Sequence, residues 1–190
     1  MITSKPIQLK EDRKKIQEAI LYVMSLADGL TQYDVAKTLF LADRSHLNKY
    51  GRPITFDNYV AMEHGPVPSL AYDALKPNWD FKARFGCDRP WMSNPDPQNP
   101  KANRFTPKRE PDLRYLSRTD IEELRKALGT VQSLTFGQLR RLTHEDPAYV
   151  EAWESERRGS KAAEPMRLPL LIEEDGEELA ADLAYISSHA

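Results

Sequence analysis

The 190-residue chain contains one cysteine, Cys87, which excludes an intramolecular disulfide and a four-cysteine zinc site. No apolar run approaches the roughly 20 residues that a membrane-spanning helix needs. The amino-terminal segment MITSKPIQLKEDRKK lacks the apolar core of a signal peptide. From these absences we expect a cytoplasmic protein with no membrane partner.

The sequence also lacks the patterns of common catalytic sites. Its glycines are isolated, so neither a GxxxxGK(S/T) phosphate loop nor a GxSxG nucleophile elbow is present. No two histidines have an HExxH or HxH spacing, which leaves no local metal site. We therefore expect no catalytic residue, no metal and no cofactor, and hence no enzyme activity. The histidines concerned are His46, His64, His144 and His189.

The composition is that of an ordinary soluble globular protein, with 40% hydrophobic and 29% charged residues. The formal net charge of -2 gives no general attraction to nucleic acid, so a nucleic-acid partner is not expected. Basic residues do gather locally at Arg140 and Arg141, on a short predicted helix that follows another helix. This superficial likeness to a helix-turn-helix supports one alternative function, a DNA-binding regulator of its own locus.

Apolar residues at three- and four-residue spacing predict two paired helices, over residues 10–27 and 31–49. Gly29 ends the first helix, and Thr31 is placed to cap the second. Leu39 lies on the apolar stripe of the second helix. We expect these two helices to form the centre of the core.

Strand character is confined to two short regions. Residues 54–62 alternate imperfectly, and the following Pro66 and Pro68 suit the first turn of a helix over 69–75. Between residues 88 and 112, six prolines predict a surface loop or a weakly paired hairpin with arms at 104–106 and 113–116. That stretch is also a candidate partner-contacting loop, because it contains the large apolar residues Trp91, Met92 and Phe105.

The carboxy-terminal half is expected to be helical. Thr119 with Glu122, and Thr135 with Gln138, form capping-box patterns, and Asp146–Pro147 marks a third helix start. Beyond residue 153 the sequence predicts a polar linker, a short extended arm at 167–172 and a last helix at 175–187. The predicted fold is mainly α, a compact helical domain with minor strands at 54–62 and 104–116. Residues 1–153 form its domain and residues 154–190 a carboxy-terminal extension.

The most specific pattern lies between Val35 and Leu75. It comprises LFLAD at 39–43, YGRPIT at 50–55, YVAM at 59–62 and HGPV at 64–67, followed by Tyr72 and Leu75. This ordered series resembles the Panacea domain, the antitoxin domain of SocA-like proteins in bacterial and phage toxin–antitoxin loci. The resemblance extends over residues 16–153, from Ile16 to Trp153.

The resemblance implies an antitoxin that neutralises a cognate protein toxin. Neutralisation would occur by direct binding, or by acting as an adaptor that delivers the toxin to a protease such as ClpXP. The resemblance implies protein binding rather than chemistry, and a homo-oligomer is compatible with it.

The expected partner-binding residues all come from the matching segment. Large side chains and arginine dominate binding hot spots, which favours the tyrosines and the arginine of this set. Two alternatives stay open: a structural bond from Asp43 to backbone or arginine, and a bond from His64 to turn backbone. The five candidates are Asp43, Tyr50, Arg52, Tyr59 and His64.

Overall fold

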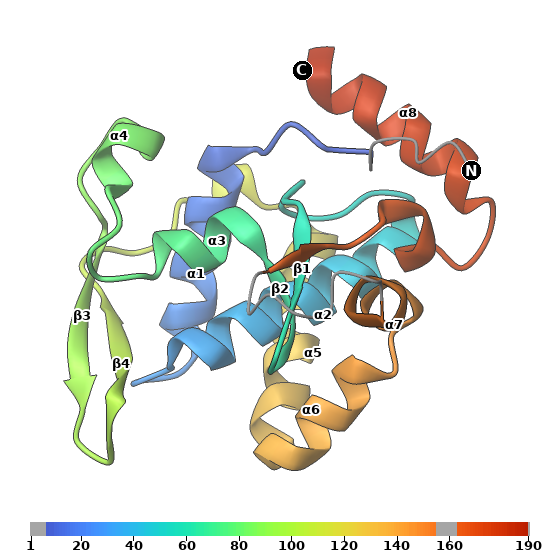
Figure 1. Cartoon of the computed structure of the whole chain (residues 1–190). Helices are drawn as coiled ribbons and strands as arrows, with labels where there is room; N and C mark the ends of the chain where they lie inside the picture. Colours follow the sequence, from blue (N-terminus) through green and yellow to red (C-terminus); the bar gives the residue numbers. More distant parts are fainter. Residues whose placement is uncertain (1–6, 155–162, 190) are drawn as a thin grey trace.

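Two helices lie at the centre of the fold, as the apolar spacing predicts. The structure, a computed structural model, describes residues 7–154 and 163–189. Helix α1 spans Arg13–Leu26 and α2 spans Gln32–Tyr50 (Figure 1). Thr31 caps α2 as expected, in a capping box with Asp34, and Gly51 ends it in the left-handed conformation.

A three-stranded sheet follows, in the order β2-β1-β5. Strand β1 (Tyr59–Met62) pairs antiparallel with β2 (Gly65–Pro68) and, on its other side, with β5 (Glu164–Pro165). The predicted strand from residue 54 begins only at Tyr59. The prediction that Pro66 and Pro68 form a helical first turn is wrong, because both lie in β2, an outer strand that tolerates a missing N–H. Helix α3 (Ser69–Ala74) begins directly afterwards.

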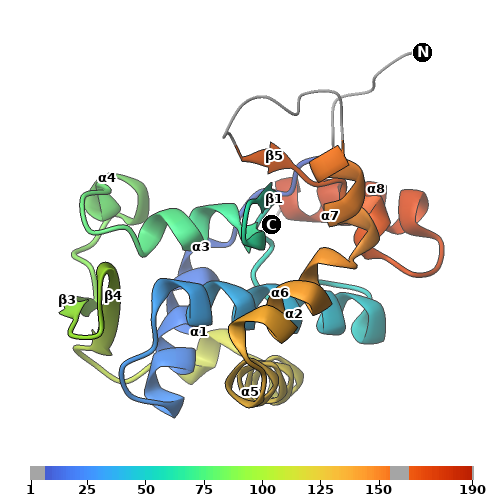
Figure 2. The ribbon, with the colours of Figure 1, turned by 60° about the horizontal axis from the view of Figure 1, so that its bottom comes forward.

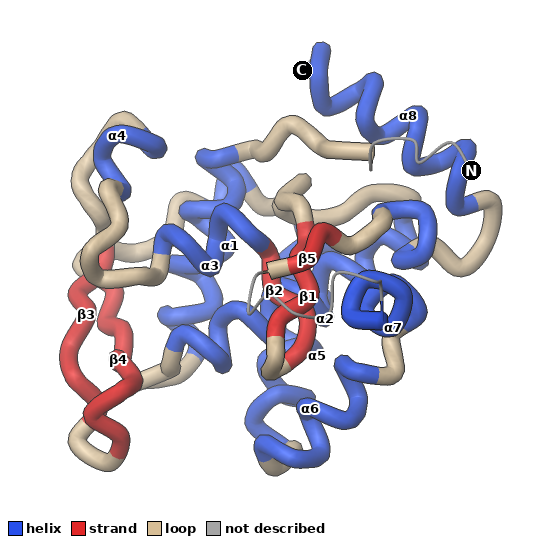
Figure 3. The backbone as a smooth tube through the Cα atoms, viewed as in Figure 1, coloured by secondary structure: helices blue, strands red, loops and turns tan. Residues whose placement is uncertain are grey.

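The proline-rich region forms a hairpin, but not with the predicted arms. Strand β3 (Trp91–Asp96) pairs with β4 (Asn99–Pro107), whereas Leu113–Tyr115 is a 3-10 helix, η1. Prolines fit because a two-stranded ribbon has an unpaired edge on each strand. Figure 3 shows this hairpin apart from the other sheet. The interpretation of the loop as partner-contacting does not hold for its two largest residues, since Trp91 and Phe105 are buried in the core.

A short helix that the sequence analysis did not identify, α4 (Phe81–Phe85), lies between α3 and the hairpin. Asp80 caps its first turn, and Gly86 ends it in the left-handed conformation. Its two phenylalanine rings stack with centroids 4.2 Å apart.

Three further helices lie between residues 118 and 154. Helix α5 (Arg118–Ser133) starts two residues earlier than predicted, because Ser117 and Asp120 form the capping box while Glu122 accepts from Arg118. Helix α6 (Phe136–His144) has the predicted Thr135–Gln138 box. Helix α7 (Pro147–Glu154) follows Asp146, whose Oδ1 accepts from the backbone N–H of Ala148 at 2.9 Å. Both of these starts are confirmed.

The carboxy-terminal segment packs onto the rest of the chain. The predicted arm is a 3-10 helix, η2 (Leu168–Leu171), and the predicted last helix is confirmed as α8 (Gly176–His189). The proposed linker falls mainly on residues 155–162, which lie outside the described residues. Figure 2 shows β5, α7 and α8 together at the side away from the β3–β4 hairpin. A domain boundary at residue 153 stays a prediction.

Helix α2 separates two apolar clusters. Leu39 packs in the first, with Ile16 of α1 and Leu124 of α5, while its neighbour Phe40 packs in the second. The second cluster contains Leu183 of α8. The fold is thus mainly α with a small β component, as predicted. Within the described ranges no helix combines the length and the apolar character that crossing a membrane requires.

Replacing Leu39 by alanine should lower the free energy of unfolding by about 2–5 kcal/mol, because the side chain is fully buried and a cavity would remain. The matched control is Leu113→Ala, at an exposed leucine, which should change it by no more than about 0.5 kcal/mol. Urea unfolding followed by circular dichroism measures both. Equal effects for the two variants would contradict the placement of Leu39 in the core.

Candidate partner-binding surface

The structure does not gather the five predicted partner-binding residues on one surface. Asp43 is 1% exposed and Tyr59 is 6% exposed, so neither side chain offers area to a partner in this fold. This corrects the expectation that they belong to an exposed patch. Tyr50, Arg52 and His64 remain at the surface, and a binding role for them stays a prediction.

Asp43 anchors the loop between α2 and β1. Its Oδ1 accepts from the backbone N–H groups of Ile54 at 2.8 Å and Thr55 at 3.0 Å. Its Oδ2 accepts from the hydroxyls of Thr55 and Tyr59. Burial raises the pKa of Asp43 above its ordinary value, and these bonds oppose that rise. The sequence left open whether Asp43 would bond to backbone or to arginine. In the structure it accepts from backbone N–H groups.

A second buried carboxylate, Asp57, continues the same loop. Its oxygens accept from the backbone N–H groups of Leu70 at 3.0 Å and Ala71 at 2.8 Å, the second and third residues of α3, whose N–H groups have no acceptor within the helix. Pro68 at the cap position makes no side-chain bond to the helix, so Asp57 supplies the missing cap from a distance. Burial raises the pKa of Asp57 to about 7 against the lowering effect of these donors.

Arg52 is engaged within the molecule. Its Nη2 donates to Oδ1 of Asp120 at 2.9 Å, and Lys15 Nζ lies 2.8 Å from the other oxygen of that carboxylate. His46, buried beside them, donates from Nδ1 to the Arg52 carbonyl at 2.8 Å. Arg52 thereby joins the end of α2 to the start of α5. Tyr50, whose ring lies 4.5 Å from that of His46, is 45% exposed.

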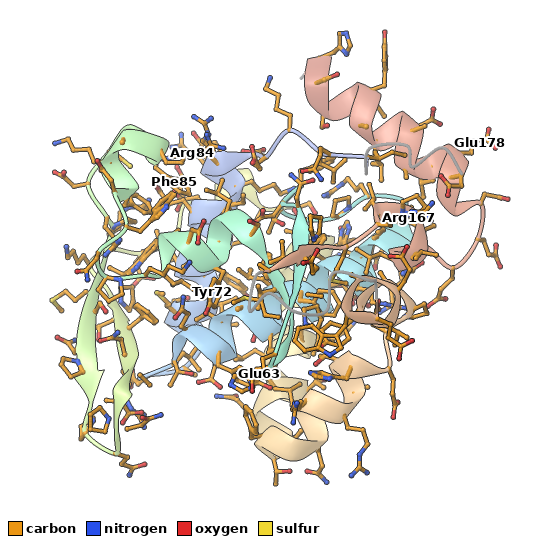
Figure 4. The ribbon with its side chains drawn as sticks, viewed as in Figure 1. Glu63, Tyr72, Arg84, Phe85, Arg167 and Glu178 are labelled. Carbon is orange, nitrogen blue, oxygen red and sulfur yellow. The ribbon has the colours of Figure 1, made fainter. Side chains whose placement is uncertain are left out.

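His64 lies far from Tyr50, beside α6. The centroid of its ring lies 5.6 Å from that of Phe136. The Phe136 centroid in turn lies 5.1 Å from that of Tyr33, near the start of α2. Tyr33 and Tyr50 are 17 residues apart on one helix, or about 25 Å at 1.5 Å per residue. Figure 4 shows Glu63, the neighbour of His64, at the tip of the β1–β2 hairpin next to α6. The surface candidates therefore fall into two separate groups.

The group beside α6 includes residues outside the five predicted candidates. Phe136, at the first position of α6, is 53% exposed although its ring is held between two others. An open hollow next to it is lined by Phe136, Gly137, Arg140, Arg141 and His144. We name His64, Phe136, Arg140 and Arg141 the Phe136 surface. Its only advance signal in the sequence is an aromatic residue directly after the helix cap Thr135.

Behind this surface, Gly65 brings three elements together. Its φ of +98° is one that side-chain-bearing residues rarely adopt. A Cβ there would lie 2.5 Å from Nζ of Lys37 on α2 and 2.8 Å from Oγ1 of Thr143 on α6. Lys37 Nζ donates to the carbonyl of Pro66 at 2.9 Å. The absence of a side chain at Gly65 is thus what allows α2, β2 and α6 to meet.

The arrangement suits recognition. It offers aromatic surface and directed donors, the groups that contribute most to binding hot spots. Within the described parts of the chain, no three His, Cys, Asp or Glu side chains are placed to hold a metal ion.

Comparison with known proteins gives one family. The model of the family described as "Antitoxin SocA-like, Panacea domain" matches residues 35–149, from the first turn of α2 to α7. No curated protein and no solved structure matches the chain. The matched range contains Asp43, Asp57, Gly65 and the whole Phe136 surface.

Asp43→Ala should lower the free energy of unfolding by roughly 3 kcal/mol or more, because it leaves two buried N–H groups and the protons of two hydroxyls without an acceptor. The control Asp73→Ala removes a partly exposed carboxylate whose ion pair is with the exposed Lys76, and should change it by about 0.5 kcal/mol at most. Chemical unfolding of both variants measures the difference. A stable Asp43→Ala protein would show that the loop does not depend on this carboxylate.

Gly65→Ala should destabilise the protein by about 1–3 kcal/mol, because it combines an unfavourable φ with a steric overlap at Lys37 and Thr143. Gly129→Ala is the matched control: this helical glycine has open space around its Cβ position, and alanine there should stabilise by about 0.5–1 kcal/mol. Melting temperatures of the two variants should therefore move in opposite directions. A shift of the same sign in both would contradict the role of Gly65.

Proposed function

The chain belongs to the SocA-like antitoxin family with a Panacea domain, and on that premise we propose that it neutralises a cognate protein toxin by direct, non-catalytic binding. Neutralisation by contact requires an exposed recognition surface on a rigid scaffold. The family match identifies the kind of protein but does not say which surface contacts the toxin. The Phe136 surface is our candidate for that contact.

One observation carries this choice. Phe136 is about half exposed, and its ring packs against the rings of Tyr33 and His64, with centroid distances of 5.1 and 5.6 Å. An aromatic side chain that is already fixed loses little conformational freedom on binding. Arg140 and Arg141 lie beside it and add directed donors, and arginine with aromatic residues is the usual content of a hot spot.

The candidate surface continues along α7. Trp153 is partly exposed and stacks on Tyr149 with ring centroids 5.8 Å apart. The Tyr149 ring lies 4.3 Å from that of His144, and its hydroxyl donates to the Met62 carbonyl at 3.0 Å. Helices α6 and α7 are therefore attached to the same hairpin that presents His64. A toxin that covers Phe136 has a further aromatic contact within reach at Trp153.

The adaptor mechanism is the second way to remove the toxin, and it needs two surfaces, one for the toxin and one for the protease. The group at the far end of α2, with Tyr50 and Arg52, supplies a second site in this proposal. The two mechanisms differ in one measurable quantity. Direct neutralisation leaves the amount of toxin in the cell unchanged, whereas delivery to a protease lowers it.

A DNA-binding regulator is the alternative from another class. Its support is Arg140 with Arg141 on α6, which follows α5 after a short turn. Against it, the net charge is -2, and Glu145 directly follows that helix. A salt-dependent shift of the promoter DNA of its own locus would favour this alternative.

Phe136→Ala and Arg140→Ala should each weaken toxin binding by about 1–2 kcal/mol without lowering the melting temperature substantially. The candidate toxin to test is the protein encoded by the adjacent reading frame, co-expressed to test relief of growth arrest and then purified for titration calorimetry. Tyr185→Ala and Arg118→Ala are the controls, since both side chains are exposed on other helices. They should bind as tightly as the unaltered protein.

The same measurements on Tyr50→Ala and Arg52→Ala decide between the two ends of α2. Full affinity in both Phe136→Ala and Arg140→Ala, with loss in Tyr50→Ala, would move the contact to the far end. Persistent growth arrest in the presence of folded, unaltered protein would contradict the antitoxin function itself.

A further inference from the structure

Helix α8 is attached to the rest of the chain by one narrow side. Its buried residues are Ala180, Leu183 and Ser187, at the three- and four-residue spacing that places them on one face. The opposite face is exposed at intervals along the helix from Glu177 to His189. Figures 1 and 3 show α8 at the outer edge of the molecule. The helix therefore has a second face that no described element covers.

This open face carries the most exposed large hydrophobic side chains among the described residues. Tyr185 is 67% exposed and Ile186 is 55% exposed. The ring of His189 lies against that of Tyr185, with centroids 4.3 Å apart. Removing such groups from water is favourable. The open face thus offers apolar surface to a partner.

Four residues form a straight stripe along the centre of the open face. They follow one another at spacings of four, three and four residues, which keeps them on one side of a helix. The amino-terminal half of the stripe is acidic, and its carboxy-terminal half is aromatic. Figure 4 shows Glu178, the first of them, on the outer side of α8. The four are Glu178, Asp182, Tyr185 and His189, and all are exposed.

The two halves of this stripe complement each other. Carboxylates only accept hydrogen bonds, whereas the phenol of Tyr185 and a protonated His189 donate them. A second α8 that runs antiparallel to the first therefore meets each acidic half with an aromatic half. A parallel copy would set carboxylate against carboxylate, which is unfavourable. Because the same face serves both copies, the antiparallel contact closes with two-fold symmetry.

We propose that two copies of this chain form a dimer through antiparallel packing of their α8 helices, in which Tyr185 of each copy inserts into the stripe of the other. The two-fold axis lies level with the midpoint between residues 183 and 184. Each ring then lies among four residues spaced as in the hole that receives a knob in helix packing. Ala181 leaves room for the ring because its side chain is small. The four residues of the hole are Glu178, Ala181, Asp182 and Tyr185.

The same register pairs the polar groups of the two copies. Asp182 lies level with Tyr185 of the second copy and accepts from its hydroxyl. Glu178 lies level with His189 of the second copy. Nδ1 of His189 bonds to the Tyr185 carbonyl at 2.8 Å within its own helix, so Nε2 is the nitrogen that meets the carboxylate. Arg13, exposed at the same end of α8, adds a positive charge there.

The expected dimer is weak, and it leaves the candidate toxin surface open. A helix of 14 residues is about 21 Å long, so this contact is smaller than a standard interface of about 800 Å² per partner. We therefore expect reversible association that depends on protein concentration. Figures 1 and 2 show α8 apart from α6, which carries Phe136. Each copy in the dimer keeps its own Phe136 surface, and the inference does not rest on the proposed function.

Sedimentation velocity of the full chain over a concentration series tests the dimer. The buffer is reducing, because the exposed Cys87 would otherwise allow a disulfide between two copies. The unaltered protein should convert from monomer to dimer as its concentration rises. Tyr185→Ala should raise the dissociation constant about tenfold or more. Tyr115→Ala, at an exposed tyrosine outside α8, is the matched control and should dimerise like the unaltered protein.

A second variant keeps Tyr185 and fills the hole. Ala181→Arg, at an exposed position, should abolish the dimer and leave the melting temperature of the dilute protein unchanged. Ala83→Arg, at an exposed alanine of α4, is its control and should dimerise normally. A monomer at every concentration up to about 500 μM would overturn the inference. Full dimerisation of both Tyr185→Ala and Ala181→Arg would overturn it as well.

An exchange of charges tests the antiparallel register. Glu178→Arg and His189→Glu should each weaken the dimer severalfold, because each sets like charges against each other across the contact. The double variant should restore the dimer. The two positions are about 16 Å apart on one helix, so no rescue arises within one copy. Failure of the rescue in a double variant that keeps its helix content by circular dichroism would overturn the proposed dimer.

Discussion

The carboxylate of Asp43 holds the loop on which the rest of the central fold depends. It takes the N–H groups of residues 54 and 55 out of any sheet ladder and receives the hydroxyl of Tyr59 at the start of β1. The chain direction set there carries Asp57 to the start of α3, where it caps a helix whose own cap position is a proline. The buried carboxylate of Asp43 on α2 thus fixes where the sheet begins. The carboxylate of Asp57, in the loop that Asp43 holds, fixes where α3 begins. The hairpin that presents His64 follows from the same point.

The sequence predicts local features of this fold well and long-range ones poorly. The caps at Thr31, Thr135 and Asp146 were identified because donor and acceptor lie within three residues of each other. The arms of the β3–β4 hairpin were misassigned, because pairing depends on which of several short segments finds the core, and Phe105 packs there while Leu113 does not. Helix α4 is too short to show a periodic pattern.

The candidate site was predicted in part, for the same reason. The segment that carries the family pattern does hold the buried carboxylates and Gly65, but a pattern of residue types cannot distinguish a buried tyrosine from an exposed one. Tyr59 and Tyr50 read alike in sequence, and only the tertiary bond to Asp43 separates them. Phe136 lies outside the family pattern found in the sequence. Its ring contacts are with Tyr33 on α2 and His64 between β1 and β2, about 70 to 100 residues away, and such distant contacts leave no local pattern.

The pairing of β5 with β1, and of α8 with the second cluster, has a consequence for synthesis. Leu9 and Phe40 leave the ribosome early, yet the surface they pack against includes Leu168 and Leu183. The first cluster, built from α1, α2, α5 and the β3–β4 hairpin, can pack while translation continues. The second cluster stays incomplete until residues 163–189 have emerged. During that interval the nascent chain exposes apolar surface and an unpaired edge of β1, both targets for chaperones and proteases. Closure of the second cluster therefore waits for residues 163–189 to be made and docked.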